Sequence, residues 1–327
     1  MTRYVVRRLL AMIPTLFLVS IACFIIIQLP PGDFVTSLAA QTAGSGSSAD
    51  QATLDNLRHQ YGLDQPKYIR YIKWVSGFAH GDFGYSFEWK RPVAQLIGDR
   101  LGLTLLLSTL SLALTWLIAV PVGVYSATHR YSGLDHALTA FAFLGLSIPD
   151  FLLGLMYLAI GIFVFQMSAT GLVSPRFADA PWSFAKLADV ANHLLWPSII
   201  LGLGGMTQLI RILRGSMLEV TNQQFVTTAR AKGLDERVVI HKHALKVAIN
   251  PLVSVMGLQL PQLISGATIL GIVLSMPTTG PMFVRALISQ DMYLAGTFLL
   301  FLALMLMMGN LLADVALAWI DPRIRYQ

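Results

Sequence analysis

Residues 101–128 have the sequence LGLTLLLSTLSLALTWLIAVPVGVYSAT, and none of them carries a charge. A helix needs about 20 consecutive apolar residues to cross the roughly 30 Å hydrocarbon core of a membrane. Within that core every backbone N–H and C=O group must be paired inside the protein, so this run is expected to form a membrane-spanning helix. The segment therefore places the chain among integral membrane proteins.

The composition of the whole chain agrees with this assignment. Hydrophobic residues make up 55% of the 327 residues and charged residues only 12%, about half the charged share of a soluble domain. Five further apolar runs are candidate spans, at residues 9–31, 137–164, 194–210, 247–276 and 292–320. We predict an all-α integral membrane protein with six transmembrane helices.

The first span follows three arginines, as the apolar part of a secretory signal does. It is too long for a signal, and no small-residue cleavage site follows before Pro30. We expect it to be a retained helix. The single cysteine, Cys23, lies in this run and is expected to be a small buried hydrophobic residue.

Lysine and arginine near the span ends predict the orientation of the chain. Basic residues lie before the first span, at Arg130 between the second and third, and after the last span at Arg323 and Arg325. Residues 211–246 contain seven basic and three acidic side chains. With six spans all these groups lie on one side, so both termini are predicted to be cytoplasmic. The net charge of +6 follows from this asymmetry and does not indicate nucleic-acid binding.

Residues 32–100 are predicted to form a partly helical segment on the external side, between the first two spans. Residues 41–50, QTAGSGSSAD, are typical of a flexible loop. Apolar residues spaced by three and four predict helix from Gln51 to Phe78, interrupted at residues 62–66. Residues 78–87 are rich in turn and aromatic residues.

Several catalytic motifs are missing from the sequence. It has no Gly-x-x-x-x-Gly-Lys-[Ser/Thr] loop for nucleotide phosphates, no Gly-x-Ser-x-Gly elbow and no His-Glu-x-x-His pair. We predict no catalytic site, no metal site and no cofactor. Uphill transport by such a chain needs either a partner that hydrolyses ATP or an ion gradient.

An ordered series of short motifs runs through nearly the whole chain. The motifs are YVVRRL at 4–9, LPPGD at 29–33, YGLDQP at 61–66, GDFGYS at 81–86, RPV at 91–93, PVGV at 121–124, SIP at 147–149, SMLEV at 216–220, TARAKGL at 228–234, HAL at 243–245 and DPRIR at 321–325. In this order they resemble the first of the two paired permease subunits in ATP-binding-cassette importers of the oligopeptide, dipeptide and nickel class.

The resemblance implies a division into residues 1–31, with the first span, residues 32–100, and a five-helix permease core at 101–327. The core contains a cytoplasmic coupling loop at 211–250, in which a short helix, a glycine turn and a second helix rest on the ATPase subunit. The residues carried over to this role are Thr227, Thr228, Ala229, Arg230, Ala231, Lys232, Gly233, Leu234, His243 and Leu245. Thr227 departs from the family's Glu-Ala-Ala pattern, whereas Ala229 and Gly233 keep it. The alternative is an ordinary solvated loop with positive-inside charges.

Two other positions depart from the family pattern. Residues 277–281, PTTGP, retain only Gly280 of an external glycine turn. Asp150 lies where the third span usually has an uncharged residue, and an ionisable group inside a span is a functional-site hypothesis. The alternative is that Asp150 stays hydrated near the external end or beside the Pro149 break. Gln259 and Gln262, like Asp150, are candidate pathway residues, and Gln208 could also line a pathway.

The resemblance implies a subunit of an importer in the bacterial inner membrane that has no enzymatic activity of its own. It implies a homologous second permease, two ATPase subunits, an external solute-binding protein and membrane lipid as partners, and no nucleic acid. Oligopeptides or dipeptides are the expected cargo, with nickel chelates, glutathione-like peptides or oligosaccharides as alternatives. A more distant alternative is a single-chain, ion-coupled secondary transporter that uses Asp150, although no internal repeat supports it.

Overall fold

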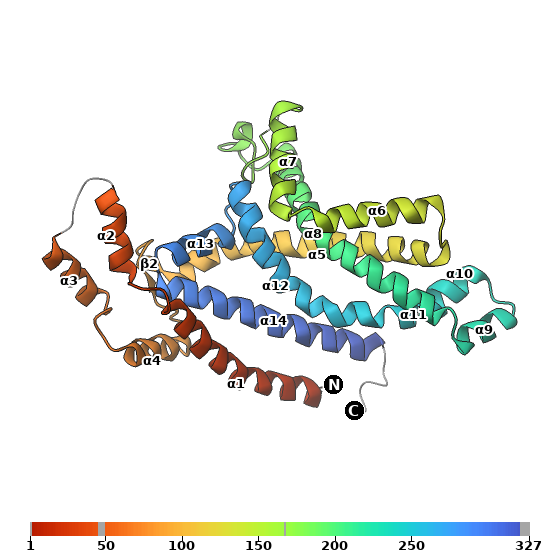
Figure 1. Cartoon of the computed structure of the whole chain (residues 1–327), viewed down its shortest axis with the longest axis horizontal. Helices are drawn as coiled ribbons and strands as arrows, with labels where there is room; N and C mark the ends of the chain where they lie inside the picture. The colour runs from red at the N-terminus through yellow and green to blue at the C-terminus, as the bar shows by residue number, and fades with distance from the viewer. Residues whose placement is uncertain (1, 45–49, 167, 321–327) are drawn as a thin grey trace. The chain divides into compact units, whose positions relative to one another are not determined.

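The computed structural model describes residues 2–44, 50–166 and 168–320, and it is built almost wholly from helices (Figure 1). Predictions that concern residues 45–49, the DPRIR motif and the two C-terminal arginines lie outside the described residues. The chain forms two compact units. The first contains residues 1–5, 105–276 and 306–327, and the second contains residues 6–104 and 277–305.

In the part of the chain that the structure describes, five helices are long and apolar enough to cross a membrane. They are α1 (Thr2–Ile27), α5 (Val93–Thr128), α8 (Phe184–Val220), α12 (Asn250–Val273) and α14 (Met292–Ile320). A sixth span is obtained if the helices α6 (Gly133–Ser147) and α7 (Asp150–Phe163) are taken together. The prediction of an all-α, multi-span fold is confirmed, and α14 has the predicted bounds.

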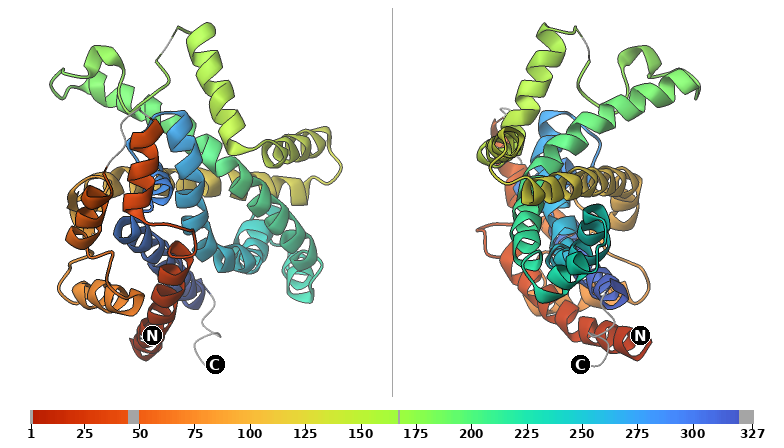
Figure 2. Two further views of the ribbon diagram at one scale, coloured as in Figure 1. Left: turned by 60° about the vertical axis from the view of Figure 1, so that its left-hand side comes forward. Right: turned by 90° about the vertical axis from the view of Figure 1, so that its right-hand side faces the viewer.

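The third predicted span, residues 137–164, is a broken pair and not one continuous helix. The axes of α6 and α7 differ by 100° (Figure 2). The break lies at Ile148, whose backbone is extended with φ −97° and ψ 123°. A residue before proline is disfavoured in the helical conformation, because the ring of Pro149 crowds the preceding backbone. The chain therefore turns sharply and restarts as a helix at Asp150.

Helix α8 is much longer than the predicted span at residues 194–210, because the charges at its ends do not interrupt it. Lys186 is buried and its Nζ donates to the carbonyl oxygen of Ala180 at 2.6 Å. At the other end, Arg214 pairs with Asp135 of α6 at 3.0 Å. A search for uncharged runs ends at such residues, although tertiary partners allow the helix to continue.

Within the first unit, α12 and α14 approach closely at two glycines. A Cβ atom on Gly257 would lie 2.5 Å from Oδ1 and 2.7 Å from Cα of Asn310. A Cβ atom on Gly309 would lie 2.6 Å from the carbonyl oxygen of Gly257. Small residues allow membrane helices to pack backbone against backbone, where dispersion contacts replace the hydrophobic effect. This crossing fixes one end of α14 against α12.

The second unit contains the small elements predicted on the external side. Helices α3 (Gln51–Gln60) and α4 (Lys67–Phe78) occupy the predicted helical stretch and leave out residues 62–66. The expected loop at 41–50 is partly wrong, because α2 (Phe34–Gly44) extends into it. Asp33 starts this helix by accepting a hydrogen bond from the backbone N–H of Thr36 at 2.8 Å.

Residues 85–92 and 277–288 add further structure to the second unit. Strands β1 (Tyr85–Ser86) and β2 (Arg91–Pro92) form a short antiparallel pair, and α13 (Thr279–Ile288) begins inside the stretch expected to be a turn. Gly280 thus lies in a helix. The buried carboxylate of Asp291 accepts hydrogen bonds from Ser86 Oγ at 2.5 Å, Glu88 N at 3.2 Å and Leu294 N at 3.3 Å. This carboxylate ties the strand pair to the start of α14.

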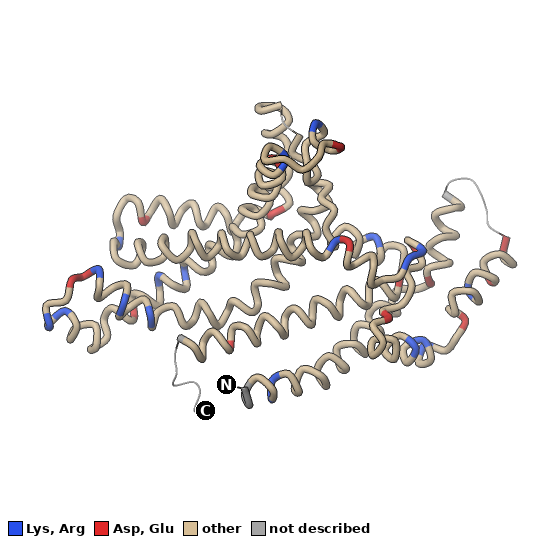
Figure 3. Tube along the Cα trace, turned by 180° about the vertical axis from the view of Figure 1, so that it is seen from behind, with Lys and Arg blue, Asp and Glu red and all other residues tan. Residues whose placement is uncertain are grey.

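Residues 224–248, here called the basic segment, follow α8 in the first unit. They form α9 (Gln224–Ala231), α10 (Glu236–Val238), the π-helical turn η2 (Val239–Ala244) and α11 (Leu245–Ala248). Lysine and arginine gather on this segment, whereas the middle parts of the long helices are nearly free of charge (Figure 3). The pattern is that of a solvated link between two spans.

Candidate coupling segment and intramembrane polar residues

Helix α9 is held against the first unit by one apolar face. Val226 and Ala229, three residues apart, are buried in a cluster that contains Val220 of α8 and Val239 and Ala244 of η2. Residues at this spacing lie on the same side of a helix. Ala229 thus supports the basic segment from within and is not on its accessible surface.

The remaining predicted coupling residues are mostly accessible. The exposed members of the set are Thr227, Thr228, Arg230, Ala231, Lys232, Gly233 and Leu234, whereas His243 and Leu245 are half-buried. The structure therefore gathers seven of the ten on the surface of one helix and the turn that follows it. These seven residues are available to a partner, whereas His243 and Leu245 pack partly against their own unit.

Gly233 occupies a turn whose backbone conformation favours glycine. Its φ is +75°, and its N–H donates to the carbonyl oxygen of Arg230 at 2.9 Å. A Cβ atom at this position would meet no heavy atom within 4 Å. The requirement for glycine thus arises from the left-handed backbone and not from crowding. This agrees with the turn that the sequence placed here.

An ion pair bridges the Gly233 turn. The guanidinium of Arg230 donates to Glu236 through Nη2 at 2.7 Å and through Nε at 3.0 Å, and its Nη1 donates to the carbonyl oxygen of Thr221 at 3.3 Å. The hydrogen bond and charge of Arg230 lower the pKa of Glu236 below its usual value, despite slight burial. Arg230 therefore links α9 to α10 across the turn.

Three accessible apolar side chains on the basic segment were missed by the sequence reasoning. Phe225, Leu234 and Val238 are each about two-fifths exposed, at 41%, 41% and 40%. They come from α9, the turn and α10, in a stretch that also contains the exposed basic residues Arg230, Lys232 and Arg237. Apolar anchors within a polar rim are the usual composition of a protein interface. The signal in the sequence was a few apolar residues within an otherwise charged stretch.

A cavity of about 760 Å³ lies beside this surface, between the end of α5 and the basic segment. Its lining includes Arg130 and Arg237, as well as the Arg230–Glu236 pair. The charged side chains of its lining are net basic and the cavity is open to solvent, so it adds a concave part to the accessible face of the basic segment.

Asp150 is the first residue of α7, directly after the break in the third span. Its side chain is half-buried, and Oδ2 lies 3.6 Å from the position that a Cβ atom on Gly266 of α12 would occupy. Among the described residues, no hydrogen bond or ion pair involves this carboxylate. The break thus places a carboxylate without a protein partner at the contact between α7 and α12.

The glutamine candidates have different surroundings. Gln259 is buried, and its Oε1 accepts a hydrogen bond from Trp116 Nε1 of α5 at 3.1 Å. Gln262, less than one turn further along α12, is exposed, as is Gln208 on α8. The structure therefore brings Gln262 to an accessible face and places Gln259 in a contact between helices.

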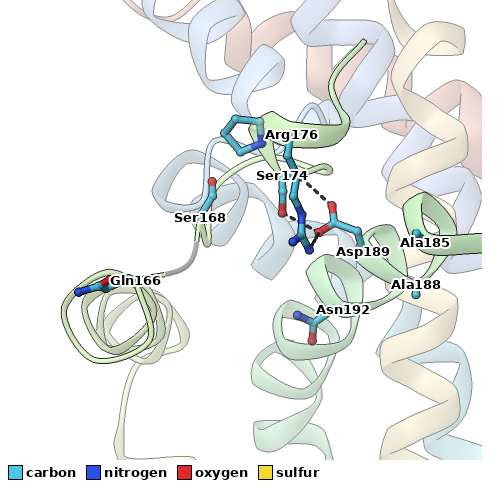
Figure 4. Close-up of a pocket in the computed structure, with 9 residues that line it drawn as sticks. Gln166, Ser168, Ser174, Arg176, Ala185, Ala188, Asp189 and Asn192 are labelled. Carbon is cyan, nitrogen blue, oxygen red and sulfur yellow. Dashed lines mark hydrogen bonds and ion pairs between the residues drawn. The ribbon is translucent and has the colours of Figure 1, made fainter. Parts of the chain in front are cut away.

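A buried polar cluster at the start of α8 was also missed. Asp189 accepts hydrogen bonds from Ser174 N at 2.7 Å and Ser174 Oγ at 2.6 Å, and Arg176 lies 3.8 Å away (Figure 4). The buried ring of His193 has carbonyl oxygens at both nitrogens, of Asp189 at 2.8 Å and of Ser168 at 3.0 Å. These contacts of the ring fasten the loop before α8 onto the helix.

Metal-binding side chains are not gathered in the part of the chain that the structure describes. No three His, Cys, Asp or Glu residues there are placed to hold a metal ion. Cys23 is buried in α1, as expected for a small apolar residue.

Comparison with known proteins matches both parts of the chain to families of transporter membrane components. Residues 119–326 match the binding-protein-dependent transport system inner membrane component, and residues 1–108 match the N-terminal part of such components. The chain belongs to this family. It is therefore a transport permease component and a multi-pass membrane protein.

Curated relatives are similar along their full lengths. The chain is 34% identical to the oligopeptide transport system permease protein AppB of Bacillus subtilis, with 100% of each chain covered. It is 33% identical to the glutathione transport system permease protein GsiC of Escherichia coli K12, again with 100% of each covered. A putative peptide permease of Brucella suis is 34% identical, with 99% of each covered.

A solved structure supports the fold. A chain of the inward-facing MetNI methionine ABC transporter matches with a TM-score of 0.54 and 18% identity, covering 69% of this chain and 97% of that one. At this identity the match supports the helical architecture alone.

Proposed function

We propose that this chain is the first of the two permease subunits of an ATP-driven importer in a bacterial inner membrane, where it forms half of the pathway for oligopeptides or dipeptides. Full-length similarity to an oligopeptide permease and a glutathione permease supports a peptide cargo. The same similarity keeps glutathione-like peptides as a specific alternative. Nickel chelates and oligosaccharides are cargoes that no observation on this chain favours.

The basic segment is the docking element for an ATPase subunit in this proposal. The observation that carries it is the accessible surface of α9 and the Gly233 turn, which combines Phe225, Leu234 and basic side chains on a rigid support. The buried face of α9 and the hydrogen bond from Arg230 to the carbonyl oxygen of Thr221 connect this surface to α8. A rigid-body push on α9 is thus passed to the spans.

The partners follow from this role. They are a homologous second permease, two ATPase subunits and an external binding protein, with membrane lipid around the spans and both termini in the cytoplasm. The absence of a phosphate-binding loop from the sequence supports ATP hydrolysis on the partner subunits. The chain itself supplies no catalytic group in this proposal.

Asp150 is the one observation that favours a second candidate, an ion-coupled transporter in which this carboxylate carries a proton or sodium ion. The two functions separate in proteoliposomes that contain all subunits, with ATP inside and no ion gradient. The importer predicts peptide uptake that depends on ATP, needs no gradient and is not abolished by Asp150→Asn. Uptake that needs an imposed gradient, ignores ATP and disappears in Asp150→Asn would establish the second candidate instead.

Binding and hydrolysis provide the complementary test. Purification from the native membrane should bring down ATPase subunits, and the isolated chain should not hydrolyse ATP. Hydrolysis by the isolated chain that depends on its own residues would contradict the proposal.

A further inference from the structure

Helix α12 presents one continuous exposed face in the middle of a candidate span. The exposed residues along it are Ser254, Leu258, Gln262, Ser265, Ile269 and Ile272, at spacings of three and four, while the other faces are buried or half-buried. Residues at these spacings form a single stripe along a helix. An exposed glutamine and serines are unfavourable against hydrocarbon, where an amide has no hydrogen-bond partner. This stripe therefore meets water or protein and not lipid tails.

Asp150 lies beside this stripe. Its Oδ2 is 3.6 Å from the Cβ position of Gly266, which directly follows Ser265 and is one helical turn after Gln262. The carboxylate thus lies at ordinary contact distance from the surface of α12 at Gly266. The break between α6 and α7 thus delivers a carboxylate to the polar part of the α12 stripe.

The helix that Asp150 starts makes the ionised form tolerable. A carboxylate in the first turn of a helix interacts favourably with the exposed N–H groups and the helix dipole. That interaction does not satisfy the carboxylate, which has no hydrogen-bond or ion-pair partner among the described residues. An ionisable group within a span is normally paired or lines a pathway. A cation from outside the chain is the missing partner.

On the basis of the proposed function, we propose that Asp150, Gln262 and Ser265 form a subsite of the pathway for an ammonium group of the cargo, such as the free N-terminus of a peptide. An ammonium group has three donors, and this site offers a carboxylate, an amide oxygen and a hydroxyl oxygen as acceptors. A divalent metal ion fits less well, since Ca²⁺ takes six to eight oxygen ligands. The subsite selects for positive charge at one point of the pathway.

The test uses proteoliposomes with all subunits and the binding protein, ATP inside, and two probes: trialanine and N-acetyl-trialanine. The readout is the ratio of the trialanine rate to the N-acetyl-trialanine rate, compared between wild type and each variant. The binding protein is the same in every sample, so its own preference between the two peptides cancels in this comparison. Asp150→Asn should lower trialanine uptake about tenfold, as for the loss of one charge-assisted hydrogen bond. Uptake of N-acetyl-trialanine should stay unchanged.

Two further variants serve as controls. Gln262→Leu alters an exposed residue, so it does not endanger folding, and it should lower trialanine uptake by a smaller factor. Asp314→Asn removes a carboxylate from another span, α14, and should leave the ratio of the two rates unchanged.

An equal loss of both peptides in Asp150→Asn, or no loss, would overturn the subsite while leaving the importer in place. A wild-type complex that imports neither probe, despite intact ATPase subunits, would count against the proposed peptide import itself and against the subsite with it.

Discussion

Replacing Gly233 by valine isolates the contribution of one backbone angle to coupling. The native φ of +75° is one that a β-branched residue rarely adopts. Because no heavy atom lies within 4 Å of the new Cβ position, the substitution adds no steric clash with the rest of the chain. Any effect therefore comes from the conformational energy of the turn.

The magnitude follows from that energy. A residue with a side chain in the left-handed region costs roughly 1–2 kcal/mol, which corresponds to about a 5- to 30-fold lower population of the native turn. Gly215 is the matched control, since it lies in α8 with φ in the ordinary range and with no heavy atom within 4 Å of its Cβ position. Valine at position 215 should be nearly neutral.

The assay is the complete importer in proteoliposomes, with peptide uptake and peptide-stimulated ATP hydrolysis measured on the same vesicles. Gly233→Val should reduce both, while membrane insertion and basal hydrolysis remain. Gly233→Asn should recover part of the activity, because asparagine tolerates the left-handed conformation. The reasoning is refuted if Gly233→Val and Gly215→Val give the same uptake and the same stimulation.

Three further results are expected. Gly257→Ala should destabilise the first unit by about 1–3 kcal/mol, measured by thermal unfolding in detergent, because its Cβ would lie 2.5 Å from Asn310; an unchanged midpoint would mean that α12 and α14 are not in contact there. The protection factors for amide exchange across the α9–α10 turn should be the same at about pH 5 and at pH 8, because the lowered pKa of Glu236 keeps its ion pair with Arg230 until the pH falls below the ordinary carboxyl range; smaller protection factors already at pH 5 would contradict the pair. Asp291→Ala should lower the free energy of unfolding by about 1–3 kcal/mol for each buried donor left unpaired. Hydrogen exchange should show a selective loss of protection in β1 and β2. An equal loss throughout the chain would argue against a local role.

Most of the helices could be predicted from the sequence, since long uncharged runs and regular apolar spacing are local signals. The bounds of α14 and the positions of α3 and α4 followed from them. The full length of α8 did not, because Lys186 and Arg214 have polar partners outside the helix, and the partner of Arg214, Asp135, is 79 residues away in the sequence. The 100° break at Ile148 could not be predicted from the local sequence. Its prediction requires knowing whether neighbouring helices hold the chain helical at Pro149.

The features of the candidate site that depend on local backbone conformation were predictable from the sequence, whereas those that depend on tertiary packing were not. A glycine turn was expected at Gly233, and its φ is +75°. The burial of Ala229 depends on how α9 packs against α8 and η2, which no local pattern contains. The same holds for the exposure of Phe225, and for the two carbonyl oxygens that face the ring of His193.

The π-helical turn η2 determines how far the preceding part of the basic segment, residues 224–238, is rotated about the helix axis relative to α12. A π turn holds one more residue than the α-helix it replaces, and one residue corresponds to about 100° of rotation about the helix axis. If residues 239–244 tightened into α-helical geometry, everything before them would rotate by about that angle relative to α12, with no covalent change. The face that α9 offers to a partner is therefore determined by the number of residues in one helical turn, so a single deletion there should redirect the docking surface while leaving its composition intact.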